Sequence, residues 1–152
     1  MIYEETRRQL RELNAIYKET DAIYGEFAKR SGLSDSAFWL MYSIYEANGK
    51  CTQREISSQW AMSKQTVNSA LKGLERNGYI TLTAAKDGKH SKYISLTEKG
   101  VRFADENIAV VFKAEWLSLQ EMSDTERIAM IESSRKFMEM LKSEKVDLLR
   151  DT

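Results

Sequence analysis

Residues 52–96 constrain the fold most, because three local signals follow one another there in a fixed order. The capping box "TQRE" opens a short helix, and a tight turn leads to Ser63, a good N-cap for an amphipathic helix over 64–77. Two runs that alternate apolar and polar residues, 79–84 and 92–96, then flank the turn "KDGKH". Helix, turn, helix and hairpin in this order predict a winged helix-turn-helix.

Long helices are predicted on both sides of this segment. Apolar residues recur at spacings of three and four over 2–30, and a second helix is expected over 35–47. A long helix follows Thr97, and the capping box "SDTE" at Ser123 opens the last one. The chain has no proline and only seven glycines, a composition that suits long helices.

The predicted fold class is mainly α (α+β), in three parts. Residues 1–33 form an N-terminal helix of a dimerisation region, 34–96 form the winged helix-turn-helix with a two-stranded wing, and 97–152 form C-terminal long helices of the dimerisation region. No run approaches the roughly 18 apolar residues of a transmembrane helix, and "MIYEETRRQL" is not a signal peptide. With a single cysteine, Cys51, these features indicate a soluble cytoplasmic protein in a reducing compartment.

Charge is distributed unevenly, although the net charge of the chain is zero. Residues 50–100 hold nine Lys or Arg against four Asp or Glu, a local net charge of +5. The remainder of the chain is correspondingly acidic. A basic middle between acidic flanks favours a surface that binds a polyanion such as nucleic acid.

The helix over 64–77 has two chemically distinct faces. Its apolar inner stripe consists of Val67, Ala70, Leu71 and Leu74. Its polar outer face presents Lys64, Gln65, Asn68, Ser69, Lys72 and Arg76. The second helix of a helix-turn-helix enters the major groove, where Gln65 and Asn68 can pair with adenine and Lys64 with guanine or a phosphate. The alternative is an ordinary solvated helix face.

Further cations and hydroxyls flank this helix. Basic side chains in the loop that ends at Lys92 would reach phosphates from a wing. The start of the short helix at Thr52 favours anions. A plain solvated turn is the alternative for the loop. The complete set of predicted DNA contacts is Thr52, Arg54, Ser63, Lys64, Gln65, Thr66, Asn68, Ser69, Lys72, Arg76, Lys86, Lys89, His90 and Lys92.

The stretch "REISSQWAMSKQTVNSALKGLERNGYI", the wing and "ISLTEKG" resemble the MarR/SlyA family of bacterial transcriptional regulators. The resemblance follows the order and length of the helices over nearly the whole chain. It implies a homodimeric DNA-binding regulator, a repressor on a pseudo-palindromic operator that a small aromatic or phenolic effector releases. The family's wing also carries an Asp-x-Arg pair, but here those slots fall on Gly88 and His90, and Asp87 lies one place early. Ala61 departs too, since the turn often has glycine there.

The resemblance implies two further sets of residues. An effector cleft between the helical and winged parts would be lined by Tyr17, Tyr24, Trp39, Tyr42 and Trp116. An aromatic stripe more often belongs to a core, which is the alternative. The dimer interface would include Ile2, Leu10, Met130, Phe137, Met138, Met140 and Leu141. The last helix has a wider apolar face than a monomer requires, with simple core burial as the rival explanation.

Other classes of function fit the sequence less well. No residues assemble a nucleophile, a base and an oxyanion donor, so we expect no enzyme. Neither a cluster of metal ligands nor a glycine-rich phosphate loop predicts a metal or a cofactor. A winged-helix protein-interaction module without DNA binding is one alternative, and a redox-sensing regulator through Cys51 is another. The expected partners are double-stranded DNA, a second copy of the chain and the effector, with no membrane.

Overall fold

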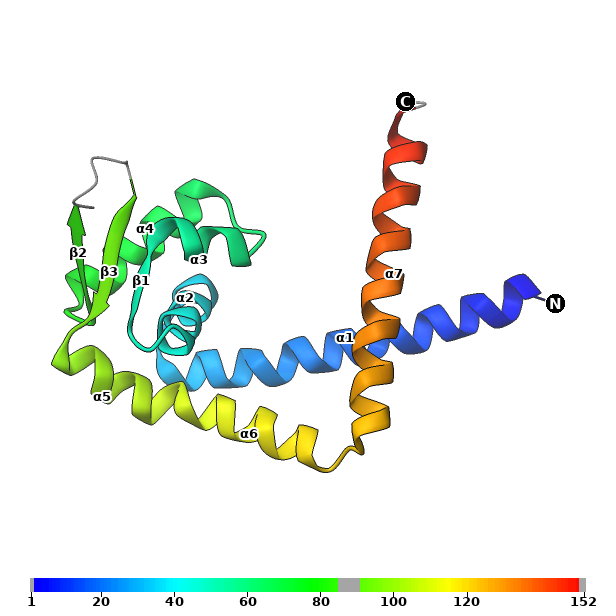
Figure 1. Cartoon of the computed structure of the whole chain (residues 1–152), viewed down its shortest axis with the longest axis horizontal. Helices are drawn as coiled ribbons and strands as arrows, with labels where there is room; N and C mark the ends of the chain where they lie inside the picture. Colours follow the sequence, from blue (N-terminus) through cyan, green and yellow to red (C-terminus); the bar gives the residue numbers. More distant parts are fainter. Residues whose placement is uncertain (1, 85–90, 151–152) are drawn as a thin grey trace. The chain divides into compact units, whose positions relative to one another are not determined.

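The computed structural model describes residues 2–84 and 91–150. It confirms the expected fold class, a mainly helical chain with a small antiparallel sheet (Figure 1). The elements are α1 (Ile2–Ser31), α2 (Asp35–Glu46), β1 (Lys50–Thr52), α3 (Gln53–Gln59), α4 (Lys64–Arg76), β2 (Ile80–Ala84), β3 (Lys92–Leu96), α5 (Glu98–Asn107), α6 (Ala109–Gln120) and α7 (Asp124–Arg150). Within the described ranges, no helix is both long and apolar enough to cross a membrane.

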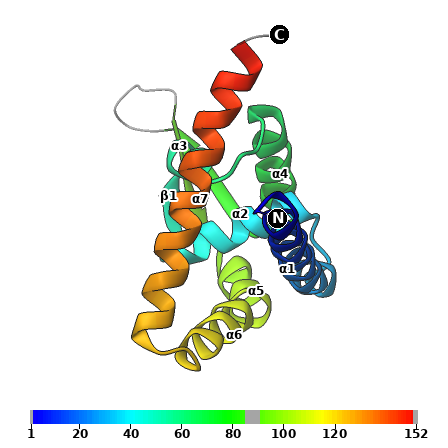
Figure 2. The same ribbon diagram turned by 90° about the vertical axis from the view of Figure 1, so that its right-hand side faces the viewer.

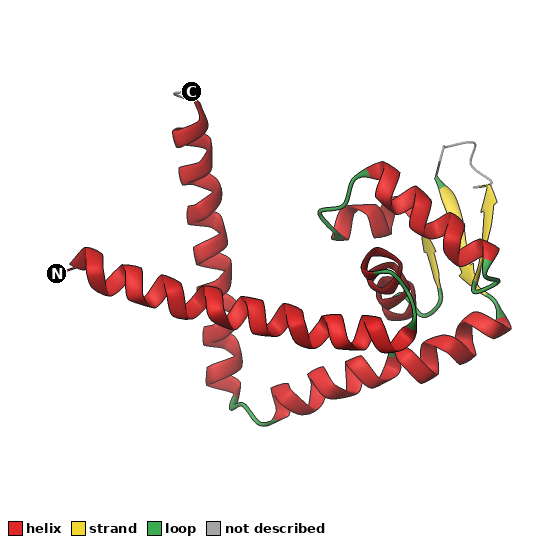
Figure 3. Ribbon diagram, turned by 180° about the vertical axis from the view of Figure 1, so that it is seen from behind, coloured by secondary structure: helices red, strands yellow, loops and turns green. Residues whose placement is uncertain are grey.

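Internal contacts divide the chain into two compact units, Met1–Val111 and Phe112–Thr152. The first unit holds α1 to α5, the sheet and the start of α6. The second unit holds the remainder of α6 and all of α7. All strands of the sheet, yellow in Figure 3, belong to the first unit.

The core of the first unit forms around α2. This helix begins at Ser34, whose hydroxyl accepts from the backbone N–H of Ala37 at 3.3 Å, and it lies next to α3 and α4 (Figure 2). The largest fully buried side chains are Phe38, Leu40, Met41, Ile44, Ile56, Val67, Leu71, Leu74, Ile80, Ile94, Ile108 and Val111. Burying one such side chain stabilises the fold by about 1.5–3 kcal/mol. The inner stripe of α4 therefore fastens that helix to the core and turns its polar face outward.

The sheet has three antiparallel strands in the order β1–β3–β2. The hairpin of β2 and β3 confirms the predicted wing, with Ile80 opposite Leu96 and Ala84 opposite Lys92. The third strand, β1, was not expected from the sequence. It is three residues long and pairs Cys51 with Ile94 of β3. So short a strand has no periodicity of its own and forms only through tertiary pairing, which no local pattern predicts.

The single long helix predicted after Thr97 is wrong, because the chain breaks at Ile108 into α5 and α6. The backbone N–H of Val111 donates to the carbonyl of Ile108 three residues back, at 2.9 Å. The side-chain amide of Asn107 donates to the carbonyl of Phe103 at 3.0 Å and competes for an acceptor of the helical ladder. Ile108 and Val111 are both buried, so the apolar spacing continues across the break and conceals it.

Three predicted helix starts are confirmed. Thr52 and Glu55 form a reciprocal capping box at the start of α3. The backbone N–H of Thr52 donates to the carboxylate of Glu55 at 2.7 Å, and this bond lowers the pKa of Glu55. Ser63 caps α4 by accepting from the backbone N–H of Thr66 at 3.1 Å. Ser123 caps α7 in the same reciprocal way as Thr52.

Candidate nucleic-acid interface

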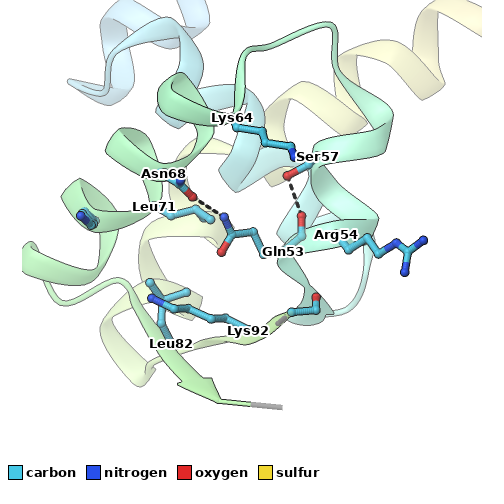
Figure 4. Close-up of a pocket in the computed structure, with 10 residues that line it drawn as sticks. Gln53, Arg54, Ser57, Lys64, Asn68, Leu71, Leu82 and Lys92 are labelled. Atoms are coloured by element: carbon cyan, nitrogen blue, oxygen red, sulfur yellow. Dashed lines mark hydrogen bonds between the residues drawn. The ribbon is translucent and has the colours of Figure 1, made fainter. Parts of the chain in front are cut away.

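The helices α3 and α4 and the two strands of the wing surround a hollow of about 990 Å³ (Figure 4). We call it the basic hollow. Its lining residues are Gln53, Arg54, Ser57, Lys64, Asn68, Leu71, Lys72, Leu82, Ser91 and Lys92. It brings together DNA contacts that the sequence predicts on two different helices and on the wing.

The basic hollow carries an excess of positive charge. Four cationic side chains line it, and none of its described lining residues is Asp or Glu. A concave surface with charges of one sign concentrates the electrostatic field and attracts an oppositely charged polymer. Four of the nine cations in residues 50–100 therefore line one local surface.

The outer face of α4 is open to solvent, as predicted. Its exposed residues are Lys64, Gln65, Thr66, Asn68, Ser69, Lys72, Glu75 and Arg76. At the start of the helix, the hydroxyls of Ser63 and Thr66 are hydrogen-bonded to each other at 2.8 Å. These two hydroxyls hold the first turn in place, and the longer side chains beyond them extend outward.

The polar groups of α3 partly stabilise α3 itself. The hydroxyl of Thr52 caps the helix, and the hydroxyl of Ser57 donates to the carbonyl of Gln53 at 2.7 Å. Arg54 is exposed and, in Figure 4, points away from the centre of the basic hollow. Arg54 thus extends the positive surface beyond the rim of the hollow.

Two features of this surface were not predicted from the sequence. Gln53, a residue within the capping box of α3, donates through Nε2 to Oδ1 of Asn68 on the neighbouring helix. A second hollow of about 390 Å³ is lined by Ser34, Ser36, Gln65, Thr66, Ser69 and Ala70. Both features join residues that are distant in sequence, so only the packing of helices brings them together.

The tip of the wing lies outside the described residues. This concerns the predicted contacts Lys86, Lys89 and His90, together with the Asp-x-Arg slots of the loop. At the base of the wing, Lys92 is exposed and lines the basic hollow. The base therefore contributes to the candidate interface, and the contacts of the tip stay predictions.

The C-terminal end of α4 is held by the start of α5. The backbone N–H of Thr97 donates to the carbonyl of Tyr79 at 3.0 Å, and its hydroxyl donates to the carbonyl of Gly78 at 2.5 Å. The ammonium of Lys99 donates to the carbonyl of Asn77 at 2.7 Å. The motifs "NGYI" and "LTEKG" thus form one hydrogen-bonded unit, which we call the α4–α5 clamp.

Two glycines make the α4–α5 clamp possible. A Cβ atom on Gly100 would lie 1.9 Å from the carbonyl oxygen of Tyr79, so only glycine allows α5 to approach so closely. Gly78 has a φ of +76°, in the left-handed region that favours glycine. The spacing of glycines in the two motifs is therefore explained by their contact in space.

Three of the predicted effector-site residues meet in an aromatic cluster. Trp39 lies at its centre, with ring centroids 5.0 Å from Tyr24 and 5.4 Å from Tyr42. Trp60 adds a fourth ring 4.8 Å from Trp39. Its indole N–H donates to the buried hydroxyl of Ser43 at 2.6 Å. The cluster joins α1, α2 and the residue that ends α3.

The other two predicted effector-site residues lie at the surface. Tyr17 on α1 is 44% exposed and Trp116 on α6 is 58% exposed. Trp116 also belongs to the second compact unit. Their part in an effector site stays a prediction.

The residues predicted at a dimer interface are exposed in the single chain. The side chain of Ile2 lies outside the described part, and Leu10 is 45% exposed. The remaining members, each at least 40% exposed, are Met130, Phe137, Met138, Met140 and Leu141. Since α7 contains no buried residue, core burial does not account for its wide apolar face.

Cys51 lies in β1 with its side chain buried. Burial, and to a smaller extent the charge of Glu55, raise the pKa of its thiol to about 11. Reactive cysteines depend on the thiolate, which is scarce in such a site near neutral pH. The environment of Cys51 therefore argues against the redox-sensing alternative.

Comparison with known sequences relates this interface to a family. A sequence model of the MarR family matches residues 31–90. The HTH-type transcriptional regulator PrsX of Escherichia coli is 27% identical over 79 residues, which cover 51% of this chain and 48% of PrsX. The chain thus spans about half the length of the curated relative that it matches.

Solved structures of MarR family regulators share the fold over most of the chain. NMB1585 from Neisseria meningitidis has a TM-score of 0.70 and 23% identity, and covers 90% of this chain and 98% of its own. MepR of Staphylococcus aureus, in its DNA-binding conformation, has a TM-score of 0.72 and 18% identity. The match covers 85% of this chain and 95% of MepR. MarR of the same organism, in complex with salicylate and kanamycin, has a TM-score of 0.68 and 20% identity. The match covers 91% of this chain and 93% of MarR. Together with the match over residues 31–90, this fold confirms the resemblance of the winged helix-turn-helix to the MarR family.

Proposed function

We propose that this chain is a DNA-binding transcriptional regulator that acts as a homodimer and represses its promoters until a small aromatic effector binds. The observation that carries the proposal is the basic hollow beside the exposed face of α4. Its described lining includes four cations and no carboxylate. This function requires neither catalysis nor a cofactor.

In the proposed complex α4 reads the DNA sequence. Its buried stripe fastens it to the core, so that its first turns can enter the major groove with Gln65 and Asn68 toward the base edges. The lysines of α4, with Arg54 from α3 and Lys92 from the wing, meet phosphates. Phosphate contacts set the register of the protein on the duplex, and the side-chain amides select the sequence.

The exposed apolar face of α7 supports a homodimer. Large apolar patches on a soluble chain mark surfaces that bind a partner, and α7 exposes Phe137 and Leu141 together with three methionines. Exposed apolar residues of α1, among them Leu10 and Ile16, offer a second surface. A two-fold dimer would present two copies of α4 to half-sites about 34 Å apart on one face of a pseudo-palindrome.

The aromatic cluster supports the effector part of the proposal. Trp39, Tyr24 and Tyr42 offer ring faces and edges that suit a planar aromatic ligand. Through Trp60 the cluster reaches the end of α3, so a ligand wedged among these rings would displace α3 and distort the basic hollow. Salicylate, which MarR of Staphylococcus aureus carries in its solved complex, is a suitable probe.

The test is to measure the affinity of the chain for the DNA upstream of its own gene as the salt concentration is raised. If each protomer places the four cations of its basic hollow on phosphates, a dimer neutralises roughly eight of them. The logarithm of the association constant should then fall with the logarithm of salt with a slope of about −7. A duplex of the same length and shuffled sequence is the control and should bind more weakly.

Affinity that is indifferent to both salt and sequence would exclude DNA recognition. That result would favour the alternative, a winged-helix module that binds another protein. Affinity that depends on salt but not on sequence would show that the chain binds nucleic acid without recognising an operator sequence. Only dependence on both supports a regulator.

A further inference from the structure

A hydrogen bond between two amides crosses the basic hollow. Nε2 of Gln53, the first residue of α3, donates to Oδ1 of Asn68, in the second turn of α4. The two side chains point toward each other in Figure 4. Both residues line the surface at which the proposed DNA would lie.

The backbones at both ends of this bond are fixed. On α3, the capping box of Thr52 and the bond from the Ser57 hydroxyl to the Gln53 carbonyl hold the first turn. On α4, the fully buried Leu71, one turn beyond Asn68, holds the helix against the core. The Asn68 amide therefore has a set direction, because its donor partner stands on a fixed element.

This bond limits what Asn68 can offer to a base. Bidentate pairing with adenine requires the amide oxygen to accept from N6 and the amide nitrogen to donate to N7. In the structure the bond from Gln53 turns Oδ1 of Asn68 toward α3. The oxygen keeps a second lone pair, but Nδ2, on the opposite side of the amide, is the atom directed away from Gln53 and toward DNA in the proposed complex. The major-groove partners of a lone donor are O6 and N7 of guanine, O4 of thymine and N7 of adenine.

We infer that Gln53 is a specificity-determining residue, which orients the amide of Asn68 so that it presents a hydrogen-bond donor to one base pair of each half-site. This inference rests on the proposed DNA-binding function. Gln53 acts here as a positioning residue, through Asn68. The apolar contacts of Ile56 and Leu71 already hold α3 and α4 in the core, so the surface bond is not needed for packing.

The substitution Gln53→Glu provides the most direct test. A carboxylate only accepts hydrogen bonds, so Asn68 must turn and donate its Nδ2 to it, leaving Oδ1 toward the DNA. The base preferred at that position should then change to one that offers a donor: N4 of cytosine, or N6 of adenine where the native chain prefers guanine or thymine. Gln53→Ala removes the constraint and should flatten the preference at the same position.

The experiment selects binding sites from a library of random-sequence DNA duplexes, with the full-length chain. Native protein, Gln53→Glu and Gln53→Ala are compared, with Gln59→Glu and Gln59→Ala as matched controls. Gln59 is exposed at the other end of α3 and is not among the residues that line the basic hollow. We expect the Gln53 variants to change the preference at one position per half-site by about tenfold, and the Gln59 variants to change overall affinity alone.

A double substitution separates positioning from a direct base contact. If Gln53 acts through Asn68, then Gln53→Ala should leave the base preference of an Asn68→Ala protein unchanged. Thermal unfolding followed by circular dichroism checks that each variant is folded. The conservative variant Gln53→Glu keeps the shape of the side chain, so the test does not depend on the alanine variant.

Two negative results have different meanings. If the native chain selects a sequence and loses affinity with salt, but the Gln53 variants keep its base preferences, the inference is overturned and the proposed function stands. An additive effect of Gln53→Ala in the Asn68→Ala background also overturns it. If the native chain selects no sequence at all, the proposed function and the inference fail together.

Discussion

The hydroxyl of Thr97 donates to the carbonyl oxygen of Gly78 at 2.5 Å and so ties the start of α5 to the residues that end α4. The same hydroxyl caps α5 by accepting from the backbone N–H of Gly100 at 3.0 Å. The ammonium of Lys99 lies 4.8 Å from the centroid of the Tyr79 ring and adds a cation–π contact. The direction of the helix proposed to read DNA therefore depends on a helix outside the winged hairpin.

Replacing Gly100 with alanine should break the α4–α5 clamp. The new Cβ would meet the Tyr79 carbonyl oxygen at 1.9 Å and force α5 away from it. We expect the free energy of unfolding to fall by about 2–3 kcal/mol in urea denaturation.

The control is Gly25→Ala on α1, where no heavy atom lies within 4 Å of the added Cβ. This change should raise the free energy of unfolding by about 0.5–1 kcal/mol. If Gly100→Ala and native protein are equally stable, the α4–α5 clamp can rearrange around the added Cβ without loss of stability, and the prediction is wrong.

The substitution Phe137→Asp should convert a dimer into monomers. Phe137 lies within the wide apolar face of α7, and burying a carboxylate at an interface costs several kcal/mol. Sedimentation equilibrium at micromolar concentration measures the change in mass. Ser143→Asp, six residues further along α7 and so on another side of the helix, adds the same charge and should leave the dimer intact. A native chain that sediments as a monomer would contradict the proposed assembly.

Salicylate should quench the tryptophan fluorescence of the chain and release it from DNA. The substitution Trp39→Phe replaces the central indole of the aromatic cluster with a smaller phenyl ring and should weaken salicylate binding about two- to tenfold. Trp116→Phe changes a ring that is 58% exposed and serves as the control. If Trp116→Phe weakens binding and Trp39→Phe does not, the aromatic cluster is not the effector site.

Cys51 should react slowly with thiol reagents in the folded chain. Its pKa is raised to about 11, so at pH 7 to 9 the thiolate is rarer in the folded than in the unfolded state, where the ordinary value is 9.0. The same shift affects the free energy of unfolding. Below about pH 9 the stability that Cys51 contributes is fully present, and it is lost as the pH rises toward about 11. In that range the folded state still holds a proton that the unfolded state has released, so raising the pH favours unfolding. Labelling rates measured with and without urea test this. Rapid labelling of the native chain at pH 7, or peroxide-dependent DNA binding that Cys51→Ala abolishes, would restore the redox alternative.

The elements that sequence reasoning found are those with signals inside their own residues. The capping box of Thr52, the N-cap Ser63 and the stripe from Val67 to Leu74 each depend on neighbours within one or two turns of helix. Such local preferences agree with the tertiary fold here, so the wing and the predicted helices are confirmed, except for the single helix after Thr97, which breaks at Ile108. The polar face of α4 followed for the same reason, because burial of one face determines which residues remain outside.

What the sequence did not predict depends on contacts between distant residues. The strand β1 forms by pairing with β3 across more than 40 residues of chain, and its own three residues are too few to establish a strand period. The bond between Gln53 and Asn68 joins two helices. The sequence around Gln53 was already accounted for by the capping box, so nothing there indicated a second role for this residue. Trp60, at the C-terminal end of α3, packs its ring against Trp39 of α2. This contact depends on how the two helices pack, about which the periodicity of the sequence carries no information.

The pairing of β1 with β3 has a further consequence for the shape of the DNA that this chain can accept. The last residue of β1 is Thr52, which caps α3, so a single hydrogen-bonded sheet joins the base of the wing to the start of that helix. Arg54 and Lys92 therefore stand at a spacing fixed by strand geometry rather than by loops. In the proposed complex, a duplex whose phosphates lie further apart or closer together would have to bend to meet both cations, and the cost of bending differs between sequences that no side chain touches.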